Sequence, residues 1–246
     1  MTKQHTDYER SDQINGAILT ATGVPQLNEA LWEISDHLGA DGAVFTSFAR
    51  DDETRESYKF VVACPARWCM EYNQNAWYAA DPCLLYALAN NEPELIQNLT
   101  LRSRGQKNMM AAAKDAGFVS GVVIPAHSPS GRSRIGVMYI GSRDPDYFNE
   151  AKLRKHRMLL RSVSSEMLDW FVRDEKKALL PLGDLSKEEL ELLKMTHGGY
   201  KSTEIADNLS LTKSAIDQKL FRLAKRFGTG SRKTAAAIAF RCGLLT

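Results

Sequence analysis

Leu185-Ser-Lys-Glu-Glu-Leu-Glu-Leu-Leu193, followed by Gly199-Tyr-Lys-Ser-Thr-Glu-Ile-Ala206 and Leu209-Ser-Leu-Thr-Lys-Ser-Ala-Ile216, is the most informative stretch of this chain. Ser186 and Glu189 have the spacing of a capping box, in which each side chain bonds the free backbone N–H of the other residue. Thr212 is the expected N-cap of a later helix. The pattern predicts three short helices in succession, and a fourth from Ser231 to about residue 243.

The third of these helices has two different faces. Ile216, Leu220, Leu223 and Phe227 recur at helical spacing, so one face belongs to a small core. The opposite face is polar and consists of Lys213, Ser214, Asp217, Gln218, Arg222 and Lys225. A helix with a polar outer face on a small helical core is typical of a helix-turn-helix that inserts into the major groove of double-stranded DNA.

Charge is divided unevenly along the chain. The whole chain has a formal net charge of +2, but residues 185–246 hold 11 Lys and Arg against 6 Asp and Glu, a net charge of +5. The preceding residues hold the other 21 basic and 24 acidic residues, a net charge of −3. A charged helix is usually only a solvated surface, but a basic module on a weakly acidic chain favours contact with phosphates.

Length and composition place the chain among globular proteins of one or two domains, with 246 residues and 43% hydrophobic residues. No apolar run approaches the ~20 residues of a membrane span. The N-terminus lacks the apolar segment of a signal peptide, so we expect a cytoplasmic protein with no membrane association. The cysteines, Cys64, Cys69, Cys83 and Cys242, lack zinc-ligand spacing, which predicts reduced thiols and no metal.

Residues before position 176 show a mixed pattern that predicts an antiparallel sheet between two layers of helices, an α-β-α sandwich in an α+β protein. The predicted helices cover residues 24–38, 65–90 (helical segments), 105–116 and 149–175. The predicted strands cover 43–49, 58–62, 118–126 and 135–140, the last two joined by a turn at 128–131. We therefore expect a small-molecule-binding domain at 1–175, a linker at 176–184 around Pro181 and Gly183, and an all-α DNA-binding domain of four helices at 185–246.

Motifs in both parts resemble one family. Trp68-Cys-Met-Glu-Tyr72, Asp81-Pro82 and Gly117-Phe-Val-Ser-Gly-Val-Val-Ile-Pro125 resemble an autoinducer-binding signature. Glu189, Leu193 and Gly199 stand where a LuxR/GerE helix-turn-helix has its signature residues. Along essentially its whole length, the chain resembles a LuxR-type quorum-sensing transcription regulator.

The resemblance implies a small-molecule effector and no other cofactor, with an N-acyl-homoserine lactone as the expected ligand. The Trp68 indole would donate to the lactone carbonyl, Asp81 would accept from the amide N–H, and Tyr72 would donate to the acyl carbonyl. Gly121 would permit close approach of the ligand. The expected walls of the tail pocket are Phe48, Phe60, Val62, Tyr86, Val123 and Met138. Without the resemblance, Trp68 and Tyr72 would be a core pair and Asp81 a helix N-cap.

Three departures from the family pattern lie at expected ligand contacts. Cys64 replaces a Tyr that lines the pocket, Ile96 replaces a Trp at the lactone end, and Tyr139 stands where many members have a small hydroxyl residue. Such changes occur in LuxR-type solos that respond to other molecules, including plant-derived compounds. The alternatives to a lactone are therefore a non-lactone signal, or control by a protein partner or heterodimer.

The resemblance also implies a homodimer that binds a pseudo-palindromic operator, with RNA polymerase as a further candidate partner. Lys213, Asp217 and Gln218, at the start of the third helix beside Ser214, are expected at base edges. The expected phosphate contacts are Lys201, Lys219, Arg222, Lys225, Arg232 and Lys233. The candidate dimer surface is the helix at 149–175, through Leu153, Leu160, Val163, Met167 and Phe171, unless this face only covers the sheet.

Two other classes of protein fit the sequence less well. A phosphorylation-controlled response regulator needs an early acidic pair and a phospho-accepting Asp at a strand end, which the N-terminal pattern does not supply. An enzyme is also not expected, because Gly117-Phe-Val-Ser-Gly121 lacks the Gly-x-Ser-x-Gly order of a nucleophile elbow and no phosphate-binding Gly loop occurs. The histidines, His5, His37, His127, His156 and His197, are scattered.

Overall fold

A computed structural model describes the chain except residues 1–2, 53–54, 129–130, 180–183 and 246. The chain divides into two compact units. The first comprises Met1–Phe48, Tyr58–Ser128 and Ile135–Trp170, and the second comprises Ala49–Ser57, Pro129–Arg134 and Phe171–Thr246. Each unit is described separately below.

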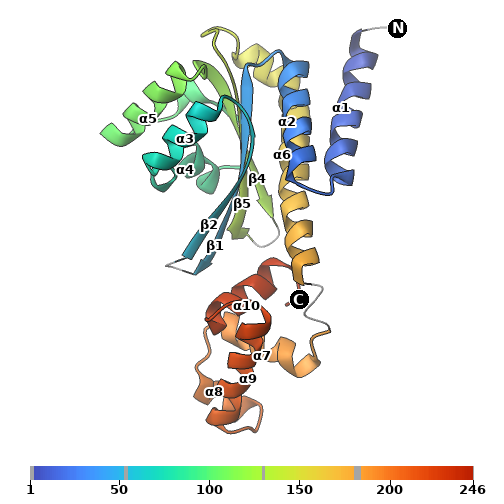
Figure 1. Ribbon diagram of the computed structural model, residues 1–246, viewed down its shortest axis with the longest axis vertical. Helices are drawn as coiled ribbons and strands as arrows, with labels where there is room; N and C mark the ends of the chain where they lie inside the picture. The colour runs from blue at the N-terminus through green and yellow to red at the C-terminus, as the bar shows by residue number, and fades with distance from the viewer. Residues whose placement is uncertain (1–2, 53–54, 129–130, 180–183, 246) are drawn as a thin grey trace. The chain divides into compact units, whose positions relative to one another are not determined.

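The first unit is built on a five-stranded antiparallel sheet of order β2-β1-β5-β4-β3 (Figure 1). Two pairs of consecutive strands supply most of the sheet, and β3 joins its edge by pairing Glu94 with Val123 and Leu95 with Val122. The strands are β1 (Gly42–Asp52), β2 (Arg55–Ala63), β3 (Glu94–Leu95), β4 (Ser120–Ser128) and β5 (Gly131–Ser142). Residues 129–130 of the predicted turn lie outside the described part of the chain.

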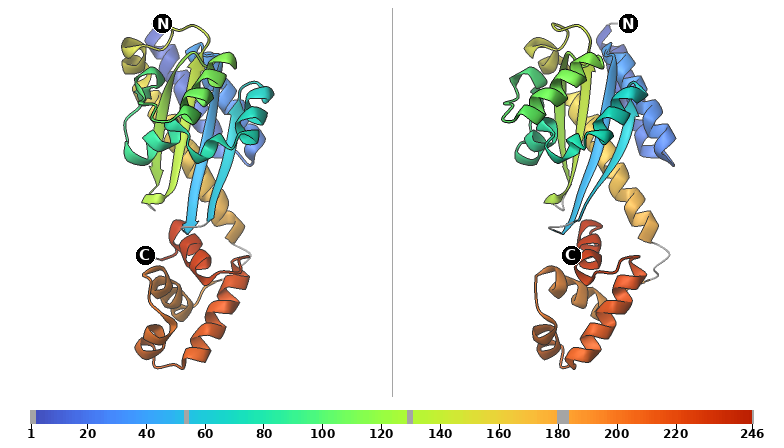
Figure 2. Two further views of the ribbon diagram at one scale, coloured as in Figure 1. Left: turned by 90° about the vertical axis from the view of Figure 1, so that its left-hand side faces the viewer. Right: turned by 60° about the vertical axis from the view of Figure 1, so that its left-hand side comes forward.

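Helices cover both faces of this sheet, which confirms the predicted α-β-α sandwich (Figures 1 and 2). One layer contains α1 (Lys3–Thr20), α2 (Val24–Leu38) and α6 (Glu150–Leu179). The opposite layer contains α3 (Ala66–Gln74), α4 (Pro82–Ala89) and α5 (Arg104–Asp115). Two short 3-10 helices, η1 (Trp77–Ala79) and η2 (Ile96–Asn98), lie in the connections beside α4.

The bounds of α2 agree with those predicted from its apolar spacing. Leu27, Leu31, Ile34 and Leu38 are all buried against the core. Gly39 ends the helix in the left-handed region with φ 64°, a conformation that glycine adopts without a Cβ penalty. Its N–H bonds back to the Asp36 carbonyl at 2.9 Å, which satisfies one of the last free carbonyl groups.

Several elements differ from the prediction, among them the short strand β3, which the sequence did not indicate. The helix α1 was not predicted, and the helical stretch at 65–90 is divided into α3, η1 and α4. The division follows from Ala76, which has φ 48°, and from the start of a new helix at Asp81-Pro82. The helix α6 continues to Leu179 instead of ending at Glu175, so it includes the start of the predicted linker. Pro181 and Gly183 lie outside the described residues.

The second unit contains α7 (Lys187–His197), α8 (Ser202–Asn208), α9 (Lys213–Arg226) and α10 (Arg232–Arg241). The predicted capping box is present, because Ser186 Oγ accepts from Glu189 N at 3.1 Å and Glu189 Oε2 accepts from Ser186 N at 2.8 Å. Thr212 caps α9 by accepting from Ala215 N at 3.2 Å. The core between the helices includes Leu192, Leu193, Ile205, Ile216, Leu220, Leu223, Phe227, Ala235 and Ala239.

The predicted apolar dimer surface on α6 is instead part of the interior of the chain. Leu153, Leu160, Val163, Met167 and Phe171 are each at most 9% exposed. They therefore cover the sheet side of the helix, the alternative that the sequence left open. These side chains are already packed within one chain and cannot form an apolar face for a second copy.

Candidate ligand cavity and nucleic-acid interface

A cavity of about 280 Å³ lies in the first unit between the sheet and the layer formed by α3, α4 and α5. Strands β1, β2 and β5 form its floor through side chains that alternate along each strand. These are Val44 and Thr46, Phe60 and Val62, and Val137 and Tyr139. The helical side of the lining consists of Trp68, Cys69, Tyr72, Asn73, Asp81, Cys83, Leu84, Met109, Met110 and Ala113.

Trp68 and Tyr72 reach the cavity from one face of α3, because residues four apart are neighbours on a helix. Their ring centroids are 5.9 Å apart, with the rings inclined at 60°. Trp68 is only 5% exposed and packs beside Met109, Ala113 and Phe118. The pair is therefore both core packing and cavity wall.

Asp81 is bound on both of its carboxylate oxygens. Oδ1 accepts from Cys83 N at 2.7 Å and from Leu84 N at 3.4 Å, which caps the N-terminus of α4. Oδ2 accepts from the Tyr72 hydroxyl at 2.7 Å. Burial raises the pKa of Asp81 above its ordinary value, while the three hydrogen bonds act in the opposite direction. Burial, reinforced by the Asp81 charge, also raises the pKa of Tyr72.

Tyr139 brings an unpartnered polar atom to the cavity. Its hydroxyl oxygen is buried and has no hydrogen-bond partner among the described residues. Its ring packs on Phe118 with centroids 5.1 Å apart, and burial raises the pKa of the hydroxyl well above the ordinary range. A buried hydroxyl without a partner costs free energy, and a bound molecule with a hydrogen-bonding group at this position would offset that cost.

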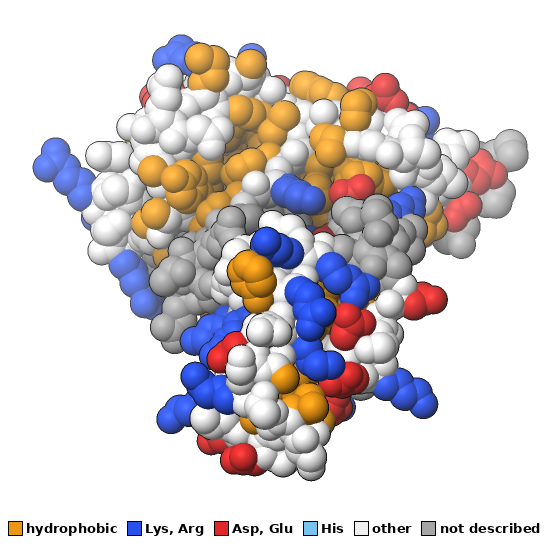
Figure 3. Space-filling model, turned by 60° about the horizontal axis from the view of Figure 1, so that its bottom comes forward, with side chains coloured by type: hydrophobic (Ala, Val, Ile, Leu, Met, Phe, Trp, Pro, Cys, Tyr) orange, Lys and Arg blue, Asp and Glu red, His pale blue; other side chains and the backbone are white. Residues whose placement is uncertain are grey.

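The outer face of α9 is the candidate nucleic-acid interface. Lys213, Ser214, Asp217, Gln218 and Phe221 are exposed and surround a shallow hollow. The opposite face holds the buried Ile216, Leu220 and Leu223, as the sequence predicts. Figure 3 turns this unit toward the viewer and shows Lys and Arg side chains across it, interspersed with Asp and Glu.

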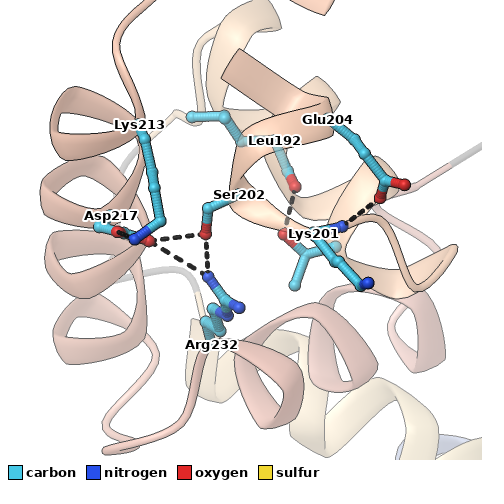
Figure 4. Close-up of polar contacts among 8 residues, drawn as sticks. Leu192, Lys201, Ser202, Glu204, Lys213, Asp217 and Arg232 are labelled. Atoms are coloured by element: carbon cyan, nitrogen blue, oxygen red, sulfur yellow. Dashed lines mark hydrogen bonds and ion pairs between the residues drawn. The ribbon is translucent and has the colours of Figure 1, made fainter. Parts of the chain in front are cut away.

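The Asp217 carboxylate contacts three side chains of the same unit (Figure 4). Its Oδ1 accepts from Ser202 Oγ at 2.6 Å and from Arg232 Nη1 at 3.3 Å, and Lys213 Nζ lies 3.6 Å from Oδ2. Arg232 also donates to Ser202 Oγ. The Ser202 hydrogen bond, more than the neighbouring cations, lowers the pKa of Asp217. The carboxylate thus ties α9 to the starts of α8 and α10, whereas the sequence predicted that it would accept from a base.

The other predicted phosphate contacts differ in their surroundings. Lys219 pairs with Glu188 at 2.7 Å, which anchors it to α7. Lys225 Nζ lies 4.6 Å from the centroid of the Phe221 ring, a cation–π arrangement. Lys201, Arg222 and Lys233 are exposed. The sequence did not single out Phe221, although it is 58% exposed on α9 and its position off the apolar stripe of that helix could have revealed it.

A family model described as an autoinducer binding domain matches residues 24–169, the part of the chain that contains the sheet and the cavity. The chain belongs to the LuxR-type quorum-sensing regulators. The HTH-type quorum-sensing regulator RhlR of Pseudomonas aeruginosa is 28% identical over 184 residues, covering 74% of this chain and 73% of that protein. The relatives are transcription regulators and not enzymes.

Solved structures of LuxR-type proteins share the fold. Escherichia coli SdiA superposes with a TM-score of 0.72 at 18% identity, covering 97% of this chain and 99% of that chain. A structure of SdiA in complex with octanoyl-rac-glycerol gives a TM-score of 0.67 at 18% identity, over 100% and 98% of the two chains. The N-acylhomoserine lactone dependent LuxR family factor CepR2 from Burkholderia cenocepacia gives 0.57 at 14% identity, over 67% and 98%.

Five of the predicted ligand contacts of this LuxR-type chain line the cavity: Trp68, Tyr72, Asp81, Phe60 and Val62; the departure Tyr139 joins them. The other predicted ligand contacts do not line the cavity, because their side chains pack in other places. Phe48, Ile96 and Val123 belong to a buried cluster beside the cavity. Tyr86 lines a separate surface hollow and donates to the Glu92 carbonyl at 3.0 Å. Met138 is fully buried between Val137 and Tyr139 and faces away from the cavity, because strand side chains alternate.

Gly121 and Cys64 also have roles other than the predicted one. A Cβ on Gly121 would lie 2.6 Å from the Ile140 carbonyl oxygen, so this glycine permits close contact of β4 with β5 and does not face a ligand. Cys64 packs beside the aromatic cluster of Trp68 and contacts Cys69, which does line the cavity. The lining residues missed by the sequence, such as Val44, Met109 and Val137, have the same composition as an ordinary core.

Two groups of features are absent from the described part of the chain. None of its helices is long and apolar enough to cross a membrane. No cluster of three or more His, Cys, Asp and Glu side chains among the described residues is arranged to hold a metal ion.

Proposed function

We propose that this chain is a ligand-responsive transcription regulator whose cavity binds an amphiphilic acyl signal, with an N-acyl-homoserine lactone as the first candidate. The observation that carries the proposal is the buried Tyr139 hydroxyl, which has no hydrogen-bond partner among the described residues and lies on a cavity that is otherwise mainly apolar. Ligand pockets combine an apolar lining with a few placed polar groups, and this cavity has that composition. Its volume of about 280 Å³ suits a small molecule.

The polar groups of the cavity match the head of such a molecule. Trp68 brings an indole N–H donor, and Asp81 brings an acceptor that can take the ligand amide N–H. The Tyr72 hydroxyl, which donates to Asp81 at 2.7 Å, can turn to the acyl carbonyl once the ligand amide occupies Asp81. The ligand then replaces one internal hydrogen bond by several, which offsets the cost of burying these groups.

A second candidate is an acyl chain with a head group other than a homoserine lactone. The SdiA complex with octanoyl-rac-glycerol supports it, because an acyl glycerol binds a protein of the same fold. In this chain Ile96 is buried in the neighbouring cluster, where the family pattern has an aromatic residue at the lactone end. Loss of that ring removes a surface that is specific for the lactone and leaves the apolar tail site.

We further propose that the second unit binds double-stranded DNA through α9, with two copies of the chain on one pseudo-palindromic operator. Gln218 and Lys213 are the proposed base contacts, and Phe221 can contact a thymine methyl group. Lys201, Arg222, Lys225 and Lys233 are proposed to bind phosphates. Asp217 and Arg232 are proposed to hold α9 in place on α8 and α10, given their mutual contact at 3.3 Å.

The test is the melting temperature of the full chain with a panel of acyl-homoserine lactones and acyl glycerols of varied chain length. A ligand that binds only the folded state raises stability by about 2.7 kcal/mol at a hundred times its dissociation constant. A rise limited to lactones supports the first candidate, and a rise with acyl glycerols supports the second. No response to any member of either class would contradict an acyl ligand.

Two tryptophan variants complete the experiment. Trp68→Phe keeps an aromatic side chain but removes the indole N–H donor. It should therefore reduce the rise in melting temperature that the binding ligand gives. Trp32→Phe is the matched control, because Trp32 lies on α2 and is 50% exposed. An equal loss in both variants would contradict the role of Trp68.

A further inference from the structure

Two thiols lie side by side at the edge of the cavity. Cys64 follows the last residue of β2, and Cys69, five residues later, is the fourth residue of α3. Their Sγ atoms are 3.5 Å apart, within the contact range of a sulfur hydrogen bond. Both residues are half-buried, and Cys69 lines the cavity.

The two thiols have different acidity. The hydrogen-bond contact with Cys64 is the main cause that lowers the pKa of Cys69 to about 7, while the same contact and burial raise the pKa of Cys64. Of the two thiols, Cys69 therefore loses its proton more readily, with Cys64 as the neighbouring thiol. The thiolate is the nucleophilic form of cysteine, and its proximity to the N-terminal end of α3 favours negative charge.

The other two cysteines provide an internal contrast. Cys83 is 6% exposed, and Cys242 is 1% exposed. Burial raises the pKa of each thiol, so both stay protonated and shielded at neutral pH. Reaction with a soluble oxidant is therefore directed to Cys69.

We propose that Cys64 and Cys69 form an oxidation site for peroxides, and that their disulfide remodels the wall of the ligand cavity. In the first step the Cys69 thiolate attacks one oxygen of hydrogen peroxide. An S–O bond forms, the O–O bond breaks, and the hydroxide that leaves takes a proton from solvent. In the second step the Cys64 sulfur attacks the Cys69 sulfenic acid, the S–S bond forms, and the sulfenic oxygen leaves as water with the Cys64 proton.

The second step requires only a small movement of the two sulfur atoms. The S–S bond is about 2.05 Å long, so the sulfurs approach by less than 2 Å from their present contact. The bond would close a small loop through Pro65 and Trp68 at the start of α3. Because Cys69 lines the cavity and Trp68 precedes it, closure moves a wall residue and the proposed lactone donor together.

The first arm of the test is chemical and does not depend on the identity of the ligand. Full chain is treated with hydrogen peroxide and digested with trypsin without reduction. Cleavage at Arg67 places Cys64 and Cys69 in different peptides, 60–67 and 68–102, so the disulfide joins them as one species that a reductant separates. Fragmentation of the joined species distinguishes Cys69 from Cys83, which lies in the same peptide.

Two variants identify the attacking thiol. Cys64→Ser should leave Cys69 as a sulfenic acid that dimedone labels, because no second thiol remains to resolve it. Cys69→Ser should leave Cys64 as an unmodified thiol under the same treatment. Failure of the joined peptide to form, or equal labelling of Cys64 and Cys69 in the two variants, would overturn the oxidation site.

The second arm rests on the proposed function and measures binding of the panel member that raises the melting temperature. Oxidation should weaken its binding by about tenfold and reduction should restore it. Cys64→Ser should not show this reversible loss, whereas Cys242→Ser should show it in full. If the joined peptide forms but the affinity for the ligand does not change, the proposed effect on the cavity is overturned and the oxidation site stands. A chain that ignores every panel member would contradict the acyl ligand, while the first arm still decides the oxidation site.

Discussion

Asp81 shows how one side chain can both cap a helix and line a cavity. The sequence allowed two interpretations, a helix N-cap and a ligand contact, as though they were alternatives. In the structure one carboxylate oxygen caps α4 and the other bonds Tyr72 on the cavity wall. The cap fixes the orientation of the carboxylate on the cavity wall, as the proposed contact with a ligand amide requires.

Ionisation of this buried carboxylate should reduce the stability of the ligand-free protein. The pKa of Asp81 is raised above its ordinary value of 3.8, so near that pH the folded state binds more protons than the unfolded state. The free energy of unfolding should therefore fall as pH rises from 3.8 toward the folded pKa, with a slope of at most about 1.4 kcal/mol per pH unit from this group.

Denaturant unfolding of Asp81→Asn across this pH range checks the effect. Asn is also a good N-cap and cannot ionise, so the variant should lose this contribution to the pH dependence while α4 remains capped. Asp36→Asn, on the exposed side of α2, is the matched control. Identical pH profiles for Asp81→Asn and the wild type would contradict the raised pKa.

Tyr139→Phe should separate stability from binding. The substitution removes a buried hydroxyl without a partner among the described residues, so ligand-free protein should gain about 1 kcal/mol of unfolding free energy. Ligands that use the hydroxyl should bind more weakly, because their own polar group then lacks a partner. Calorimetric titration with pairs of ligands that differ by one oxygen on the acyl chain measures this preference. A variant that is destabilised yet binds every ligand unchanged would refute the assignment.

Sequence reasoning found three polar or aromatic residues of the cavity, but of its apolar wall only Phe60 and Val62. Trp68, Tyr72 and Asp81 stand out because their residue types and order match a family signature. Val44 and Val137 cannot be distinguished from core residues by composition. Met138 is different, because alternation along a strand already forbids it from sharing a surface with Tyr139. That error was avoidable from the sequence alone.

At the scale of elements, predictions succeeded where local signals were strong. The stop at Gly39 and the caps at Ser186 and Thr212 give helix ends that the structure reproduces. The helix α1 was missed because its described part buries few apolar side chains, chiefly Ile14 and Ile18. The division at Ala76 depends on a left-handed backbone conformation that the residue types at this point do not predict.

Gly121→Ala should destabilise the sheet. The new Cβ would lie 2.6 Å from the Ile140 carbonyl oxygen and 3.2 Å from Gly141 Cα, and backbone atoms cannot move aside cheaply. We expect a loss of about 1–3 kcal/mol in unfolding free energy, as for other overpacked positions. Gly105→Ala in α5 is the control, since its Cβ would be 3.7 Å from Ser103 Oγ and the helix should gain up to about 1 kcal/mol. Equal effects in the two variants would contradict this account.

Variants of α9 should divide into two kinds when binding to a set of operator sequences is measured. Gln218→Ala and Phe221→Ala should change the preference among operators, with losses of about 1–3 kcal/mol at particular base pairs. Lys233→Ala should weaken all operators alike and flatten the dependence on salt, because a phosphate contact carries no sequence information. The reverse pattern would exclude the proposed orientation of α9.

At the scale of the whole molecule, the proposed ligand site and the proposed DNA-binding helix belong to separate units of one chain. The cavity lies in the first unit and α9 lies in the second. Coupling between them needs a ligand that binds two states of the protein with different affinity. By linkage, operator DNA must then change the ligand affinity by the same factor as the ligand changes the DNA affinity.

The spacing of operator half-sites offers the strictest test of a dimeric regulator. Two helix-turn-helix units related by a two-fold axis contact one face of DNA when their half-sites are about one helical turn apart, roughly 10 base pairs. Inserting about 5 base pairs turns one half-site to the opposite face, so binding should fall to that of a single half-site, and a further 5 should restore the common face. Gel-shift titrations on these operators, with a single half-site as the control, measure the effect. Since Leu153, Leu160, Val163, Met167 and Phe171 of α6 are buried within one chain, a contact between copies must use other side chains. Binding that ignores the insertion would indicate that each copy binds its half-site alone.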